Sequence, residues 1–439
     1  MTDTVDKPVR VTGEEARRIK REALGIADRR TDHGSTRGVP RSRAKEAGTQ
    51  QRVYRYRFYP SPAQAEQLEK TFGACRWVYN EALTLRVGAW EQHRVSVGFA
   101  ESCRALTGWR QASGTSWLRE VSSTVLQQSL RHLDGAFTRF FKQSAKYPQR
   151  KTKRRSRNSA TYVRTGFRWV DDPELPGTGR LTLAKQSEPL DVRWSRPLPE
   201  GADPVKLSVT RDRAGRHFVS VLVEERIQPL PAAFLPGGHE PRAVGIDLGL
   251  AALVALDDGT KIDHPRLMRK YGKELARLQR GLHRKKKGSA NRDKARERIA
   301  RLYALISDAR KDMLDQLTTR LVRENQVLVV EDLAITNLLR QLRYKCAWYG
   351  RTLVIVDRFF PSTRRCADCH AKGAPLDVSV RAWLCAECGA WHDRDVNAAR
   401  NLREEGMRLY RLVSCALQSG RVPPPVIKAS ELPAVLPAV

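Results

Sequence analysis

The sequence predicts a multi-domain protein that combines an α/β part with an α+β part. The chain has 439 residues, enough for two or three domains with substantial cores. In its first half, short strands of alternating polarity flank a long stretch with helical spacing, which is typical of α+β architecture. In its second half, short β-branched apolar runs alternate with helical patterns, as expected of a sheet covered by helices.

The first residues carry little apolar surface. Residues 1–51 are polar and rich in arginine, so we expect a basic, disordered tail with a helical pattern only over Gly13 to Leu24. This tail either has no binding role or contacts RNA or DNA without sequence preference.

A strand and a helical domain follow the tail. Val53 to Phe58 alternates apolar and basic residues, which predicts a strand with one face on a core. Pro60 ends this strand, Ser61 is suited to cap a helix, and Pro62 is suited to its first position. Apolar residues then recur at helical spacing through 61–149, and we interpret them as the core of a helical domain.

Residues 150–230 predict a small β-rich domain. Short β-type runs cover 160–164, 181–183, 206–209 and 217–223, separated by turn residues. The Pro- and Gly-rich stretch 231–241 is a linker into the second half of the chain.

Three acidic residues far apart in the sequence stand at the edges of predicted elements. Asp247 follows the apolar run of a predicted hairpin, Glu331 follows the β-branched run Val327 to Val330, and Asp395 opens a helical pattern. Each acid alone could face solvent or cap a helix. Burying an unpaired carboxylate costs several kcal/mol, so acids at the ends of buried strands need a partner. Together the three suit Mg²⁺, which prefers oxygen ligands.

Two cysteine pairs predict a structural zinc site. Four cysteines form two CxxC knuckles, Cys366 with Cys369 and Cys385 with Cys388, at the separation found in zinc ribbons. His370 and His392 flank the knuckles, but four thiolates already close a tetrahedral site. Without a secretory signal, disulfides are the weaker interpretation.

The charge predicts a polyanionic partner. Lys and Arg number 80 against 48 acids, a formal net charge of +32. Residues 150–157 and the predicted helical hairpin 266–325 concentrate this charge. No apolar run approaches the roughly 20 residues that cross a bilayer, so we expect a cytoplasmic protein, nucleoid-associated when bound to DNA. We expect phosphate contacts from Arg150, Lys151, Lys153, Arg154, Arg155, Arg157, Arg284, Lys285, Lys286 and Lys287.

Four motifs carry a resemblance to a known family. They are IDLGL, VLVVEDL, FFPSTRRCADC and WLCAECGAWHDRDVNAARNL, and VYRYRFYPSPAQAEQLEKTFGACRWVYNEAL adds similarity upstream. The sequence resembles TnpB, the OrfB-type transposon-encoded RNA-guided DNA endonucleases, and the compact type V CRISPR effectors related to them. The resemblance covers roughly residues 52–405.

The resemblance implies a fold with a particular order of domains. A wedge-like β-barrel over 52–60 and 150–230 would be interrupted by a helical recognition domain over 61–149. After the linker, a RuvC-like nuclease domain of RNase H-like fold over 242–360 and 392–412 would contain a zinc ribbon inserted over 361–391, with a tail over 413–439.

The resemblance also implies an activity and its residues. A guide RNA would pair with double-stranded target DNA, and Asp247, Glu331 and Asp395 would be the catalytic carboxylates. We expect these three to hold two Mg²⁺ ions about 3.5–4 Å apart, as in two-metal phosphodiester hydrolysis. Cys366, Cys369, Cys385 and Cys388 would hold one structural Zn²⁺. Asn397 would either orient Asp395 or cap its own helix.

One departure leaves an alternative open. The stretch between Glu331 and the strand beginning at Thr352 is shorter than usual in the family. A cleavage-deficient, RNA-guided DNA-binding protein, acting as a repressor or recruiter, is therefore the alternative function. An unguided DNA-binding zinc-ribbon protein is a third hypothesis, which would leave the three carboxylates without a role. The sequence does not distinguish a transposon-borne protein from a CRISPR-associated one.

Overall fold

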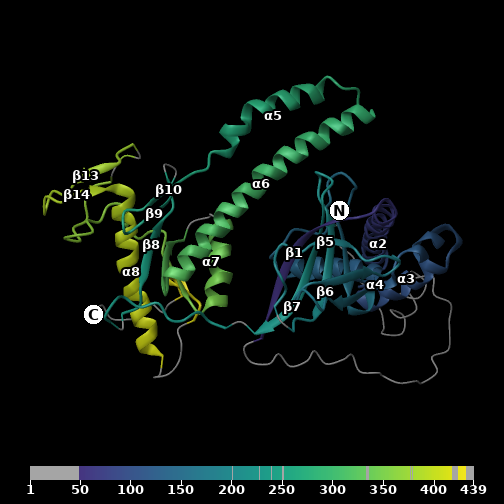
Figure 1. The fold of residues 1–439 in the computed structure, drawn as a ribbon, viewed down its shortest axis with the longest axis horizontal. Coiled ribbons are helices and arrows are strands. Elements are labelled where there is room, and N and C mark those ends of the chain that lie inside the picture. The colour runs from purple at the N-terminus through teal and green to yellow at the C-terminus, as the bar shows by residue number, and fades with distance from the viewer. Residues whose placement is uncertain are drawn as a thin grey trace, which may run out of the picture. The chain divides into compact units, whose positions relative to one another are not determined.

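The computed structural model describes residues 49–199, 201–226, 228–238, 240–249, 252–332, 336–375, 377, 379–417 and 424–431. The chain divides into two compact units, residues 1–226 and 227–439, which we describe separately (Figure 1). The helical pattern expected over Gly13 to Leu24 lies outside the described residues. None of the described helices is both long and apolar enough to cross a membrane.

The first unit contains a five-stranded antiparallel sheet and a separate two-stranded ribbon. The sheet has the order β2 (Asn158–Val163), β6 (Pro204–Arg211), β7 (His217–Arg226), β1 (Thr49–Tyr59) and β5 (Asp191–Arg193). The ribbon pairs β3 (Phe167–Asp171) with β4 (Gly179–Leu183), and the one-turn helix η2 (Arg164–Gly166) precedes it. β1 begins three residues inside the segment that we expected to be a disordered tail.

The sheet of the first unit is open, which corrects the predicted β-barrel. Among the described strands, β2 and β5 each pair with one neighbour only, so hydrogen bonds do not close the sheet. The alternating side chains of β1 and β7, such as Tyr56 and Val221, point into a core instead. Leu181 and Leu183 of the ribbon and Leu68 of the following helix pack against that core and cover the apolar face that closure would have buried.

The helices of the first unit follow β1 as predicted. They are α2 (Pro62–His93), α3 (Phe99–Gln111), the 3₁₀ helix η1 (Ser113–Glu120) and α4 (Ser123–Phe141). Ser61 caps α2: its hydroxyl accepts from the backbone N–H of Gln64, and the Gln64 side chain accepts from the N–H of Ser61. Residues such as Val78 and Leu83 of α2 pack against Leu126 and Leu130 of α4.

The second unit is built on a six-stranded mixed sheet. Its order is β10 (Lys261–Asp263), β9 (Ala252–Leu256), β8 (Ala243–Asp247), β11 (Val327–Glu331), β12 (Thr352–Val356) and β15 (Val426–Lys428). β8, β11, β12 and β15 are parallel, and β9 and β10 extend the sheet as antiparallel strands. β15 and the short helix η3 (Ala429–Glu431) lie within the predicted tail over 413–439.

Helices cover both faces of this sheet (Figure 1). On one face, Ile246 and Val330 pack against α6 (Ala290–Glu324) and α7 (Thr336–Tyr349). On the other, Val327 and Val329 pack against α8 (Arg394–Ala416). The coarse prediction of mixed α/β content is confirmed.

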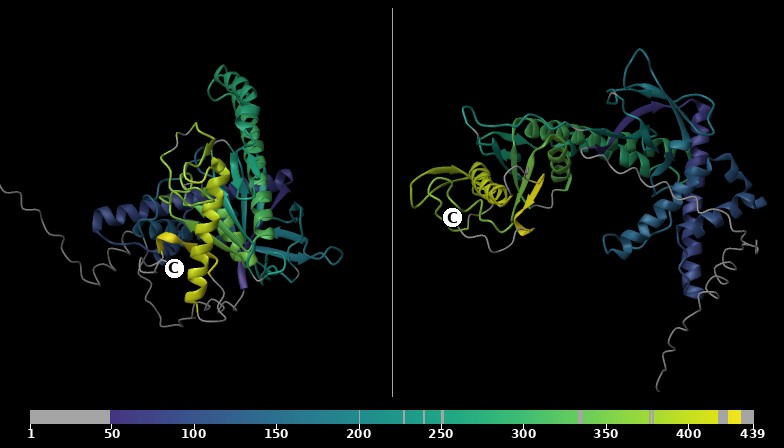
Figure 2. Two further views of the ribbon diagram at one scale, coloured as in Figure 1. Left: turned by 90° about the vertical axis from the view of Figure 1, so that its left-hand side faces the viewer. Right: turned by 90° about the horizontal axis from the view of Figure 1, so that it is seen from below.

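The remaining elements extend from the second unit. α5 (Leu267–His283) and α6 form the predicted helical hairpin, and its turn spans Arg284 to Ser289. The views in Figure 2 show α5 alongside the first half of α6. Apolar residues, including Leu275, Ile299 and Leu302, join the two helices. The cysteine-rich stretch contains the hairpin of β13 (Ala382–Leu384) and β14 (Trp391–Asp393).

Candidate active site and metal centre

Two of the predicted acids end neighbouring parallel strands. Asp247 is the last residue of β8 and Glu331 the last residue of β11. Ile246 pairs with Val330 in the register of these strands, so the next residue of each strand lies at the same edge of the sheet. Side chains alternate along a strand, and Asp247 and Glu331 therefore share the face opposite to Ile246 and Val330. That face is the one covered by α8.

α8 brings the third acid to this edge. Two glycines allow the helix to lie directly on the sheet: a Cβ on Gly245 would collide with the backbone of Ala399, and a Cβ on Gly406 would collide with Val329. Ala399 is one helical turn after Asp395, and Gly245 is two residues before Asp247. The first turn of α8, which contains Asp395, is thereby directed toward the carboxyl end of β8.

The electrostatics of Asp247 reflect this gathering of acids. The side chain is only 9% exposed, and its burial raises the pKa of the carboxyl to about 7. The negative charges of Asp395 and Glu331 add to the rise in pKa. Burial also raises the pKa of Glu331, which Arg358 partly opposes. The charges of Glu331 and Asp395 thus act on Asp247, and a cation there would relieve both burial and repulsion.

Basic residues hold Asp395 on its outer side. Lys261 Nζ lies 2.7 Å from Asp393 Oδ2 and 3.7 Å from Asp395 Oδ2, and Arg381 Nη1 lies 4.0 Å from Asp395 Oδ1. Asp393 also caps α8, since its Oδ1 accepts from the backbone N–H groups of Asp395 and Val396. Among the described residues, the carboxylate oxygens of Asp247, Glu331 and Asp395 do not all lie within 4.8 Å of one another.

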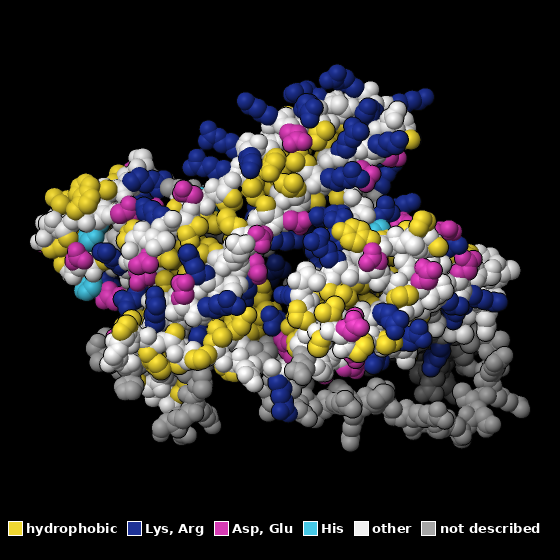
Figure 3. All heavy atoms as spheres, in the orientation of Figure 1, with side chains coloured by type: hydrophobic (Ala, Val, Ile, Leu, Met, Phe, Trp, Pro, Cys, Tyr) yellow, Lys and Arg dark blue, Asp and Glu magenta, His cyan; other side chains and the backbone are white. Residues whose placement is uncertain are grey.

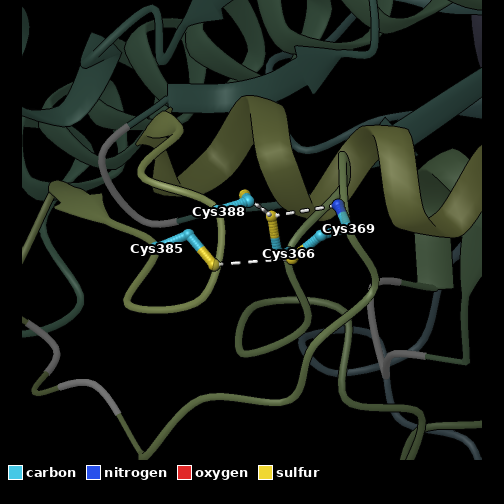
Figure 4. A group of neighbouring side chains, drawn as sticks. All are labelled: Cys366, Cys369, Cys385 and Cys388. Carbon is cyan, nitrogen blue, oxygen red and sulfur yellow. Dashed lines mark hydrogen bonds between the residues drawn. The ribbon is translucent and has the colours of Figure 1, made fainter.

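The four predicted zinc ligands form a compact cluster. The Sγ atoms of Cys366, Cys369, Cys385 and Cys388 all lie within 4.8 Å of one another. Figure 4 shows their side chains converging from two loops. The sulfurs of Cys366 and Cys388 are 3.7 Å apart, and those of Cys369 and Cys385 are 3.6 Å apart. A tetrahedral ion with Zn–S bonds of about 2.3 Å requires sulfurs about 3.8 Å apart. The donor set and its spacing therefore fit Zn²⁺.

Neither flanking histidine belongs to this group. His392 is buried, and its Nε2 lies 3.0 Å from Cys366 Sγ while its ring packs on Trp383 with centroids 4.8 Å apart. His392 thus contacts Cys366, one of the four cysteines of the cluster, through its ring. His370 instead places its Nδ1 3.4 Å from Glu404.

Asn397 connects the cysteine loops to α8. Its Nδ2 donates to the carbonyl of Arg365 at 2.8 Å, and its Oδ1 accepts from the N–H of Ala367 at 2.9 Å. Residues two apart on a helix point in different directions, so the side chain of Asn397 faces away from Asp395. Asn401, one turn later on the same side, donates to the carbonyls of Ser362 and Arg365 at 2.8 and 2.6 Å.

The predicted phosphate-binding residues lie on two elements. Arg284 to Lys287 form the turn of the α5–α6 hairpin, where Figure 3 shows Lys and Arg side chains gathered. Between Ala276 and Arg301 there are eleven Lys or Arg residues and two acids. Residues 150–157 form an exposed loop before β2, except that the side chain of Lys151 is half-buried. It lies over the ring of Tyr79, with Nζ 3.8 Å from the centroid.

Sequence reasoning missed residues that act through tertiary contacts. Lys261 was not singled out, because nothing in the β10 sequence indicates that the strand lies beside the start of α8. Gly245 and Gly406 were missed for the same reason. Asn401 had a usable signal: it repeats Asn397 at i+4, which places two buried amides on one side of a helix.

Comparisons with known proteins find family profiles and relatives that match this chain. A family profile described as "Probable transposase" matches residues 219–342, and one described as "Cas12f1-like, TNB domain" matches residues 336–402. A third, described as "Helix-turn-helix domain", matches residues 50–94. A protein of Streptomyces pristinaespiralis, named "Putative RNA-guided DNA endonuclease", is 50% identical over 376 residues, which cover 81% of this chain and 89% of that protein.

The chain belongs to the TnpB family. A more distant relative in Escherichia coli K12, "Putative RNA-guided DNA endonuclease InsQ", is 28% identical over 84% of this chain and 95% of its own length. A solved structure of "the mini-RNA-guided endonuclease CRISPR-Cas_phi3" aligns with a TM-score of 0.44 at 8% identity, covering 81% of this chain and 92% of that one. Membership in the family confirms the resemblance that the sequence motifs indicated.

Proposed function

We propose that the protein is an RNA-guided DNA endonuclease of the TnpB type. The guide RNA would select double-stranded target DNA by base pairing, and the second unit would act as a RuvC-like nuclease of RNase H-like fold. The relatives at 50% and 28% identity carry names that state this activity for them. The observation that carries the proposal for this chain is that Asp247 and Glu331 end neighbouring parallel strands, at the edge toward which the first turn of α8 directs Asp395.

Asp247, Glu331 and Asp395 would hold the catalytic Mg²⁺ ions. Their donor set consists of carboxylate oxygens, which Mg²⁺ prefers, and the buried negative charge at Asp247 needs a cation. Bound Mg²⁺ would supply Lewis-acid activation of water and stabilisation of the leaving oxygen. Asp247 is the most buried of the three, and the charges of the other two raise its pKa, so it has the greatest need of a cation.

Other residues of this unit would position the three carboxylates and contribute positive charge near them. Lys261 neutralises Asp393 and Asp395 and thereby fixes the first turn of α8. The cysteine cluster would hold one structural Zn²⁺. The hydrogen bonds of Asn397 and Asn401 would fix α8 against the loop that contains Cys366. The basic α5–α6 hairpin would contact nucleic-acid phosphates without reading sequence.

The test is cleavage by the ribonucleoprotein. Protein purified together with its RNA is incubated with plasmid that carries the target matched to that RNA, with Mg²⁺ or with EDTA. We expect cleavage only with Mg²⁺, and we expect Asp247→Ala to abolish it while leaving target binding intact. Asp263→Asn, an exposed acid at the end of β10, is the matched control and should cut as the wild type does.

Three outcomes separate the hypotheses. Cleavage by Asp247→Ala at the wild-type rate would contradict the assignment of the site. Guided binding without cleavage by the wild type would establish the alternative, a cleavage-deficient RNA-guided DNA-binding protein. The absence of any specific RNA in the purified complex would leave an unguided DNA-binding protein.

A further inference from the structure

An open cavity of about 620 Å³ lies in the first unit, and none of the three acids or four cysteines described above lines it. It is formed by one side of α2, the end of η1 and the start of the loop before β2. Its volume falls within the range of about 300–1,000 Å³ that is typical of small-ligand sites. Three segments distant in sequence thus build a concave site, of whose lining only Lys151 was named above, as an expected phosphate contact.

One wall of the cavity carries positive charge without a matching carboxylate. Asn80 holds the backbone of Lys151 on both sides, since its Oδ1 accepts from the Lys151 N–H at 2.7 Å and its Nδ2 donates to the Lys151 carbonyl at 2.8 Å. Burial lowers the pKa of the Lys151 ammonium. Within the described ranges, neither Lys151 nor Arg76 has an acidic side chain at ion-pair distance, and the Lys151 ammonium lies over the ring of Tyr79 with Nζ 3.8 Å from the centroid.

The remaining charges of the cavity largely cancel. Lys70 lies 3.4 Å from Glu120 and 3.2 Å from Glu66 in exposed ion pairs. Arg76 donates to the side-chain carbonyl of Asn158 at 3.4 Å, a long hydrogen bond that leaves most of its donors available. The surplus positive charge therefore belongs to Arg76 and Lys151.

A tryptophan cluster forms the opposite wall. Trp77 packs edge-on against Trp109 and Trp117, with ring centroids 5.6 and 5.7 Å apart. Trp77 and Trp109 pack against the helical core, but Trp117 remains 39% exposed and lines the cavity. Trp117, held edge-on by Trp77, offers an exposed ring on which a nucleic-acid base can stack.

We propose that this cavity binds one unstacked nucleotide of a single strand, with its base against Trp117 and its phosphate between Arg76 and Lys151. The chemistry is the same for guide RNA and for a displaced DNA strand, and the proposal rests on the proposed function. An aromatic surface beside two cations that lack acidic partners is the combination that single-strand binding requires.

The test uses full-length protein freed of RNA and three fluorescent probes. These are oligouridylate, oligothymidylate and an abasic deoxyribose-phosphate strand of the same length. We expect Trp117→Ala to weaken binding of a base-bearing strand about tenfold and to leave the abasic strand unaffected. We expect Lys151→Gln to weaken all strands and to reduce the slope of log K against log salt by about 0.7.

Two matched variants control for folding and for charge. Trp90→Ala removes a tryptophan of α2 that is 52% exposed and lies outside the cavity, and Lys142→Gln removes a lysine at the end of α4. Neither should change the affinity for the base-bearing strands. Whichever of oligouridylate or oligothymidylate suffers the larger loss identifies the source of the nucleotide.

Photo-crosslinking gives a readout that does not depend on variant folding. Wild-type protein irradiated with 5-iodouridine-substituted oligouridylate or oligothymidylate should form an adduct that mass spectrometry maps to Trp117 or Trp77. The proposal is overturned by adducts only elsewhere, or by equal losses in Trp117→Ala and Trp90→Ala. If Trp117→Ala binds and cuts as the wild type does, only the cavity assignment fails; if the wild type binds no probe and cuts no target, the proposed function fails.

Discussion

At the scale of single residues, the burial of the Asp247 carboxylate has a cost in stability. Its pKa is about 7 in the folded protein and 3.8 for an ordinary aspartate. Because the folded value is the higher one, its contribution to stability is fully present below about pH 4 and is lost as the pH rises through 7. A shift of this size corresponds to at most about 4 kcal/mol.

We therefore expect Asp247→Asn to stabilise the metal-free protein at high pH. In EDTA at pH 8, the variant should have a higher unfolding temperature than the wild type, and near pH 4 the difference should disappear. Thermal unfolding followed by circular dichroism across this pH range measures the effect. Asp263→Asn, whose acid is exposed, should show no such pH-dependent gain. A variant that unfolds at or below the wild-type temperature at pH 8 would contradict the argument.

At the scale of elements, the closeness of α8 to the sheet determines where Asp395 lies. This closeness depends on Gly245 and Gly406, where an added methyl group would meet backbone or a β-branched side chain. We expect Gly245→Ala to destabilise the second unit by about 1–3 kcal/mol, the usual range for overpacking. Chemical denaturation measures this. Gly272→Ala in α5 is the matched control, because its Cβ would meet nothing within 4 Å.

The cysteine loops are a second element whose position bears on α8. We expect one zinc ion per wild-type chain by elemental analysis and a loss of that zinc in Cys385→Ser. Cleavage should fall with it, since Asn397 and Asn401 hold the loop that contains Cys366. Cys415→Ser, an exposed cysteine near the end of α8, should keep zinc and activity. Full zinc occupancy in Cys385→Ser would contradict the four-thiolate assignment.

Sequence patterns predicted elements better than the contacts between them. The run Val327 to Val330 and the repeat of CxxC are local signals: the run forms the buried strand that was predicted, and the repeat brings its four sulfurs together. The pairing of β15 with β12 and the contact of Lys261 with Asp393 join segments far apart in the chain. No local period specifies such contacts. The open sheet of the first unit was also missed, because alternation predicts a buried face without saying what covers it.

At the scale of the whole molecule, charge is the dominant property. A net charge of +32 would repel itself without a polyanion, and the α5–α6 hairpin concentrates positive charge while its own ion pairs, such as Arg296 with Asp293, are exposed and weak. Release of counterions from nucleic acid is then expected to drive much of the binding, and the salt dependence of affinity becomes a measure of how many phosphates the protein contacts.

We expect the hairpin turn to account for a measurable share of that salt dependence. Changing Arg284, Lys285, Lys286 and Lys287 together to Gln should lower the slope of log K against log salt by about 0.9 for each lost contact with duplex DNA. Binding should weaken alike for matched and unmatched sequences, since phosphate contacts carry no sequence information. A control with the same charge change uses four exposed residues of the first unit: Arg180, Lys185, Arg193 and Arg213. An equal change of slope in both variants would mean that only total charge matters, whereas a larger change in the hairpin variant would show that this element lies against the nucleic-acid backbone.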